Sequence, residues 1–204
     1  MILPGQQNIL AISTAGTTIV AVRCGTRTVI KVNAARRDQA EYLVPMVEEA
    51  LHEAAASFED IARIGIVTGP GSFTGLRVGL AAARGFGLAL GLPVIGISAF
   101  DMWRKAAGVV KGKFAVALDT LRDDFFAEGD GIPAGVYELS VLAKHDDTTF
   151  AGDALGLLDV PQKLTINDRA LAEALLALTA AADADETPAN PYYLRAPDVS
   201  QPAL

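Results

Sequence analysis

The residues of this chain best suited to chemistry lie in a glycine-rich turn at positions 69–75, which reads GPGSFTG. The turn follows an apolar segment and precedes a helical pattern, so the hydroxyl of Ser72 or Thr74 is well placed to cap a helix. Free amides beside Gly71 could then receive an anion such as phosphate. However, the turn lacks the Lys-Ser/Thr ending of a Walker loop, and its Gly-x-Gly-x-x-x-Gly spacing misses the dinucleotide fingerprint by one residue. Spacing alone therefore leaves nucleotide binding as one interpretation among several.

A second turn, STAGTT at positions 13–18, separates two β-rich segments. Similar turns hold phosphate in ATPases of the sugar-kinase, actin and Hsp70 type, where the first position is usually acidic. Here that position is Ser13, so the magnesium-linked carboxylate of such sites is missing. Ser13 and Thr17, together with Gly71, Ser72 and Thr74 of the glycine-rich turn, are interpreted as a vestigial nucleotide or anion loop.

Other catalytic groups do not form a recognisable set. The two histidines, His52 and His145, lie far apart in the sequence without the spacing of metal ligands, so no metal site is predicted. The loop carboxylates Asp119, Asp123 and Asp124 could act as general bases, although such residues more often form turns. Ser72 is not in a Gly-x-Ser-x-Gly setting, which argues against a serine hydrolase.

The composition restricts the class of function. The chain has 204 residues and a net charge of −7, so its field repels phosphate backbones and no direct binding of nucleic acid is expected. Its single cysteine, Cys24, excludes an internal disulfide, and the first residues lack the features of a signal peptide. Residues 78–97 are apolar apart from Arg84, but that charge and the helix-breaking sequence at 91–93 argue against a membrane span. We therefore expect a cytoplasmic protein.

These residues require a scaffold of strands and helices. Two β-branched apolar runs, 63–68 and 93–97, flank a helix that ends near residue 90, which predicts a βαβ unit as the nucleus of the fold. Before it we predict a three-strand meander and a helix (8–13, 17–23, 26–32 and 38–57). After it we predict strands at 113–119, 124–128 and 148–152. We predict helices at 101–107, near 133–141, and from Asn167 or Asp168 to about 182.

The central helix carries small residues at every fourth position, which places them on one stripe. The stripe consists of Gly75, Gly79, Ala83, Gly87 and Gly91. Each internal glycine costs about 0.5–1 kcal/mol relative to alanine, so a close packing partner should offset the loss. Two interpretations remain open: the helix presses on its own sheet, or it is shared with a partner chain.

Several blocks of the sequence resemble one family across nearly the whole chain. They are ILAIST, GPGSFTGLRVGLAAARGFGLALGLPVIGISAFD, ALDTLRDDFFAE and NPYYLR. They are similar to the bacterial accessory subunit of tRNA threonylcarbamoyladenosine biosynthesis, the TsaB or YeaZ family. The resemblance implies an α/β, ASKHA-type two-domain fold with mixed sheets and flanking helices. Residues 1–99, completed by the tail 187–204, would form the first domain, and 100–186 a smaller second domain.

The resemblance also implies a function without catalysis. The chain would be a scaffold that pairs with its catalytic paralogue TsaD through two helices, with a TsaE-type ATPase docking on the pair, and it would form a homodimer when alone. We expect no cofactor and no ATP binding by the isolated chain. The alternative is an ATP-binding phosphotransferase or ATPase that uses the turns 13–18 and 69–75. The residues expected to contact the partner are Tyr42, Met46, Leu76, Gly79, Leu80, Ala83 and Gly87.

Overall fold

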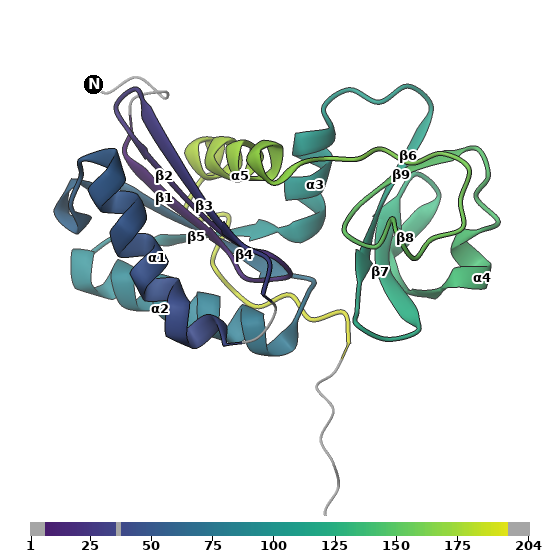
Figure 1. Ribbon diagram of the computed structural model, residues 1–204, viewed down its shortest axis with the longest axis horizontal. Coiled ribbons are helices and arrows are strands. Elements are labelled where there is room, and N and C mark those ends of the chain that lie inside the picture. Colours follow the sequence, from purple (N-terminus) through teal and green to yellow (C-terminus); the bar gives the residue numbers. More distant parts are fainter. Residues whose placement is uncertain (1–6, 36–37, 196–204) are drawn as a thin grey trace, which may run out of the picture.

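The computed structural model describes residues 7–35 and 38–195 as two β-sheets with flanking helices (Figure 1). The first sheet has the strand order β3-β2-β1-β4-β5. Its strands are β1 (Ile9–Ser13), β2 (Thr18–Cys24), β3 (Arg27–Asn33), β4 (Arg63–Gly69) and β5 (Val94–Ser98). The first three strands pair antiparallel, whereas β4 runs parallel to both β1 and β5. The predicted meander and the predicted βαβ unit are therefore confirmed.

Helices cover both faces of this sheet because its strands bury alternate side chains on opposite sides. In β1, Leu10 and Ile12 pack in one core with α1 (Gln39–Ala54) and α2 (Phe73–Leu90). Ile9 and Ala11 pack in the other core with α3 (Ala99–Ala107) and α5 (Asp168–Ala181). A 3-10 turn, η1 (Phe58–Asp60), links α1 to β4.

Local signals set the ends of the helices. At the start of α2, the Ser72 hydroxyl accepts a hydrogen bond from the amide of Gly75 at 3.2 Å. The helix ends at Gly91, whose φ of 67° is the left-handed conformation that glycine adopts at low cost. Asn167 caps α5 by accepting from the amide of Ala170 at 2.8 Å. These ends match the sequence predictions.

The second sheet has the order β8-β7-β6-β9 and lies beside the first (Figure 1). Its strands are β6 (Lys113–Asp119), β7 (Asp124–Gly129), β8 (Ile132–Glu138) and β9 (Thr148–Ala151), followed after β8 by the short helix α4 (Leu139–Leu142). One face packs with α3 and α5 through Val116, Leu118 and Phe126. The other face buries its own core around Phe125 and Phe150.

The helix predicted near 133–141 is wrong, because most of this segment is the strand β8. It pairs antiparallel with β7 across a turn at Asp130-Gly131, where Gly131 has a φ of 77°. Pro133 is tolerated because β8 is an edge strand that need not donate every hydrogen bond. The Gly-Asp-Gly sequence at 129–131 is a hairpin signal that the sequence analysis did not use.

The division of the chain at residue 99 does not describe how the helices pack. Both α3 and α5, which were assigned to the second domain, lie on the first sheet. Gly65 of β4 permits this approach, since a Cβ there would lie 2.0 Å from the Thr179 hydroxyl oxygen of α5. The tail also returns to the first sheet, where Pro188 bridges to Ile95 of β5. Residues 196–204 of the predicted tail lie outside the described residues.

Within the described ranges, none of the helices combines the length and the apolarity that crossing a membrane requires. The apolar segment 78–97 is divided between α2 and β5.

Candidate functional site

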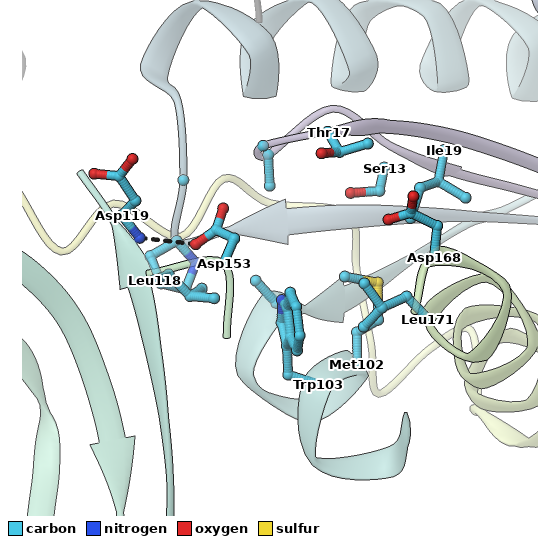
Figure 2. Close-up of a pocket in the computed structure, with 15 residues that line it drawn as sticks. Ser13, Thr17, Ile19, Met102, Trp103, Leu118, Asp119, Asp153, Asp168 and Leu171 are labelled. Atoms are coloured by element: carbon cyan, nitrogen blue, oxygen red, sulfur yellow. Dashed lines mark hydrogen bonds between the residues drawn. The ribbon is translucent and has the colours of Figure 1, made fainter. Parts of the chain in front are cut away.

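The two small-residue turns meet at a cleft between the sheets. The amide of Ser72 donates to the carbonyl oxygen of Ala15 at 2.7 Å, which joins the turn 69–75 to the turn 13–18. Figure 2 shows Ser13 and Thr17 on one side of the cleft, with Met102 and Trp103 of α3 below them. The structure thus brings together the turns that sequence analysis paired as a possible nucleotide loop.

The cleft is acidic and small. Its lining includes the carboxylate residues Asp119, Asp153 and Asp168 (Figure 2), and none of the described residues that line it is Lys or Arg. Asp153 accepts a hydrogen bond from the amide of Asp119 at 2.8 Å, which fixes it at the end of β6. The volume is about 80 Å³, whereas small-molecule sites usually occupy about 300–1,000 Å³. A polyphosphate would therefore meet like charge and little space.

Only part of the vestigial loop faces this cleft. Ser13, Thr17 and Gly71 line it, but the Ser72 hydroxyl is engaged in capping α2. Ser72 and Thr74 instead line a neighbouring cavity on the far side of the turn, and Gly71 borders both spaces. Within the described chain, no group of three or more His, Cys, Asp or Glu is arranged to hold a metal ion.

The small-residue stripe of α2 packs on the chain's own sheet. A Cβ added at Gly75 would lie 2.1 Å from the carbonyl oxygen of Thr14, and one at Gly79 would lie 2.2 Å from the Thr14 hydroxyl oxygen. Ala83 has no exposed surface, and a Cβ at Gly87 would lie 2.5 Å from the Val94 side chain. The first of the two open interpretations therefore explains this stripe.

The expected partner residues of α2 are consequently in the wrong place for contact with another chain. Leu76, Gly79, Leu80, Ala83 and Gly87 are all buried beneath α2. The spacing of four correctly placed them on one face, but the strands β1 and β4 already cover that face.

The two expected residues of α1 also face this chain. Tyr42 is half-buried, and its hydroxyl donates to the carbonyl oxygen of Ala35 at 2.6 Å, beyond the end of β3. Met46 packs partly against the core that α1 shares with the first sheet. Both residues lie on the side of α1 that faces β3. The ion pair between Glu53 of α1 and Lys31 of β3 lies on the same side.

A different face of α1 and α2 is open to solvent. On α2 the exposed residues recur every three or four positions, so they share the face opposite the buried stripe: Thr74, Arg77, Ala81, Gly85 and Leu88. On α1 the corresponding exposed residues are Glu41, Val44, Pro45, Glu48 and His52. We call these ten residues the outer face, and Figure 1 shows that α1 and α2 form the outermost layer on this side of the first sheet.

The outer face carries small and apolar residues among polar and charged ones. Leu88 has 87% of its surface exposed and Val44 has 40%, while a Cβ at Gly85 would meet no heavy atom within 4 Å. The second row of small residues, Ala81 and Gly85, would allow close approach of another helix. In the sequence this row is less conspicuous than the buried stripe, which is longer and more regular.

Comparison with known proteins identifies the family. The family model described as TsaD, tRNA N6-adenosine threonylcarbamoyltransferase, matches residues 30–132, about half of the chain. The chain belongs to this family. It is 32% identical to the uncharacterized protein Rv3421c of Mycobacterium tuberculosis over 208 residues, covering 96% of this chain and 95% of that protein. It is also 39% identical over 74 residues to the Escherichia coli tRNA threonylcarbamoyladenosine biosynthesis protein TsaB, covering 34% of this chain and 32% of TsaB.

Solved structures share the fold of this TsaB-like chain. YeaZ from Pseudomonas aeruginosa superposes with a TM-score of 0.67 at 21% identity and covers 92% of this chain and 100% of that one. A second Pseudomonas aeruginosa structure, an uncharacterized protein with similarity to peptidase YeaZ, gives 0.71 at 22% identity, with 93% and 100% covered. The predicted ASKHA-like α/β fold is therefore confirmed.

Proposed function

We propose that this TsaB-like chain is a non-catalytic subunit in the formation of threonylcarbamoyladenosine in tRNA. It would hold a TsaD-type catalytic paralogue in its working arrangement, in the cytoplasm, with a TsaE-type ATPase docking on the pair. Membership of the TsaD family and the match to TsaB support the pathway. The pairing itself is inferred from the outer face.

The exposed row on α2 is the observation that carries this proposal. Leu88 is almost fully exposed, although a buried leucine stabilises a protein by about 1.5–3 kcal/mol. Beside it, Ala81 and Gly85 present hardly any side chain, so two partner helices could pack closely on α1 and α2. An ordinary specific interface of about 800 Å² per partner could form around these two helices. When the paralogue is absent, a second copy of the chain would cover the same face and give a two-fold homodimer.

The test is co-purification with the paralogue from the same organism. Leu88→Glu and Gly85→Glu would each bury a carboxylate in the interface, and we expect at least a ten-fold loss of affinity without a loss of folding. Val109→Glu is the matched control, because Val109 is fully exposed on the loop between α3 and β6.

Ala83→Glu does not serve as this test. Ala83 is fully buried, so its carboxylate would disrupt the fold whether or not a partner binds. If Leu88→Glu and Gly85→Glu both retained the partner as well as Val109→Glu does, the outer face would not be the pairing surface.

The second candidate function is an ATPase or phosphotransferase acting in the cleft. The small volume, the three aspartates and Ser13 at the first position of the turn all argue against it. Calorimetric titration of the isolated chain with Mg-ATP separates the two functions. Under the scaffold proposal we expect no turnover, and tight binding with hydrolysis would favour the enzyme instead.

A further inference from the structure

A second and larger cavity lies on the far side of the turn 69–75. It is enclosed by the start of α2, the turn after β6 and the C-terminal segment 192–195. Its volume is about 410 Å³, which falls within the usual range of small-molecule sites, in contrast to the 80 Å³ of the acidic cleft. Neither the proposed pairing nor the family match assigns a role to this space.

The chemistry of this cavity is opposite to that of the cleft. Arg122 and Arg195 line it, and none of the described lining residues is Asp or Glu. This is unusual for a chain whose net charge is −7. Guanidinium groups bind phosphate and carboxylate oxygens through charge-assisted, often bidentate hydrogen bonds. The lining therefore favours an anionic ligand.

Aromatic rings form the other part of the lining. Phe73, Phe126, Tyr192 and Tyr193 all border the cavity. The rings of Phe73 and Tyr193 pack with their centroids 5.1 Å apart, and the guanidinium carbon of Arg77 lies 5.4 Å from the Phe73 centroid. Both tyrosines keep more than a third of their surface exposed, which leaves ring area for a ligand. A bare anion would not use these rings, whereas a planar base would stack on them.

The fold holds this wall in a fixed position. The amide of Tyr192 donates to the carbonyl oxygen of Thr68 at 2.8 Å, which fastens the segment to the end of β4. Arg195 pairs with Asp124 at the start of β7, and the Thr120 hydroxyl donates to the same carboxylate at 2.6 Å. The segment that carries both tyrosines is thus anchored to each of the two sheets.

We propose that this cavity binds a nucleoside phosphate, with the base against the tyrosine rings and the phosphate against Arg122 and the N–H groups of Arg195 other than the Nη2 that pairs with Asp124. The ligand could be a free nucleotide or a nucleotide within single-stranded RNA, since both present the same base and phosphate. The site requires no partner chain, so it can be tested on the isolated full-length protein, and its failure would leave the pairing proposal untouched.

The first experiment measures binding of four probes by calorimetry: AMP, adenosine, inorganic phosphate and a single-stranded pentaribonucleotide. We expect AMP to bind at least ten-fold more tightly than adenosine or phosphate, because only AMP engages both the rings and the guanidinium groups. Tighter binding of the pentaribonucleotide than of AMP would identify RNA as the source, and equal binding would identify a free nucleotide. Two results would overturn the proposal. One is the absence of saturable AMP binding up to about 10 mM, and the other is an affinity for phosphate equal to that for AMP.

Variants then locate the site. Arg122→Gln should reduce AMP affinity about ten-fold towards that of adenosine, and Tyr193→Leu should reduce the affinities of AMP and adenosine alike. Arg169→Gln is the matched control, because Arg169 is an exposed arginine on α5 that does not line the cavity.

Amide NMR shifts in the unmodified chain provide a readout that does not depend on any variant. On addition of AMP, we expect the shifts to fall on residues 71–74, 120–122 and 192–195. Shifts confined instead to the cleft residues Gly16, Thr17 and Asp153 would overturn the assignment.

Discussion

The matched substitutions Gly75→Ala and Gly85→Ala test which side of α2 is covered by the chain itself. Both add one methyl group to the same helix, and in a free helix both would be favourable by about 0.5–1 kcal/mol. At Gly75 the new Cβ would lie 2.1 Å from the carbonyl oxygen of Thr14. Thr14 is fully buried and this oxygen belongs to the backbone, so it cannot rotate away. At Gly85 no heavy atom lies within 4 Å.

The two variants should therefore move the free energy of unfolding in opposite directions. Overpacking costs about 1–3 kcal/mol, and an overlap at 2.1 Å with a fixed backbone atom belongs in the upper part of that range. After a gain in helix propensity of up to about 1 kcal/mol, Gly75→Ala should be less stable by about 1–2 kcal/mol. Gly85→Ala should be more stable by about 0.5–1 kcal/mol. For a chain of this length, 1 kcal/mol shifts the melting temperature by about 2–4 °C, so the two variants should differ by about 3–12 °C.

Urea denaturation and thermal melting followed by circular dichroism measure this difference. If Gly75→Ala were as stable as Gly85→Ala, α2 would not be pressed on Thr14. The stripe of small residues would then be free for a partner, which is the interpretation that the packing argues against.

Two further predictions concern the C-terminal segment and its anchors. Arg84 donates to the carbonyl oxygen of Ala189 at 2.6 Å, so Arg84→Met should speed amide exchange in residues 187–195 about ten-fold, and unchanged exchange would show that this contact does not hold the segment. Burial opposes ionisation of Asp124, but hydrogen bonds from Thr120 and Arg195 outweigh it and lower its pKa below the usual 3.8. Because this pKa is lowered on folding, the carboxylate stabilises the fold fully above about pH 4 and loses that contribution as the pH falls further. The unmodified chain should therefore be more stable than Asp124→Asn above about pH 4 and should lose this difference at lower pH, as measured by urea titration. A stability difference that does not change with pH would contradict the prediction.

Much of the first sheet and its central crossover could be predicted from the sequence. The β-branched runs that became β4 and β5 indicate strands of a parallel sheet, and the intervening helix has its own cap at Ser72 and its own stop at Gly91. These signals are local, because each depends on residues within one turn or one strand.

Tertiary structure decided what covers each face. The spacing of Gly75, Gly79 and Ala83 shows that they share a stripe, but periodicity does not say whether a sheet or a partner lies against it. The short distances from Gly75 and Gly79 to Thr14 show that the chain itself covers the stripe. The candidate interface is therefore the opposite face of α2, with Ala81, Gly85 and Leu88. Strand β8 is a different case: the Gly-Asp-Gly turn at 129–131 signals a hairpin, but the mixed sequence after it becomes a strand by pairing with β7. The cavity beside the turn 69–75 likewise exists only because segments 120–122 and 192–195, distant in the sequence, meet there.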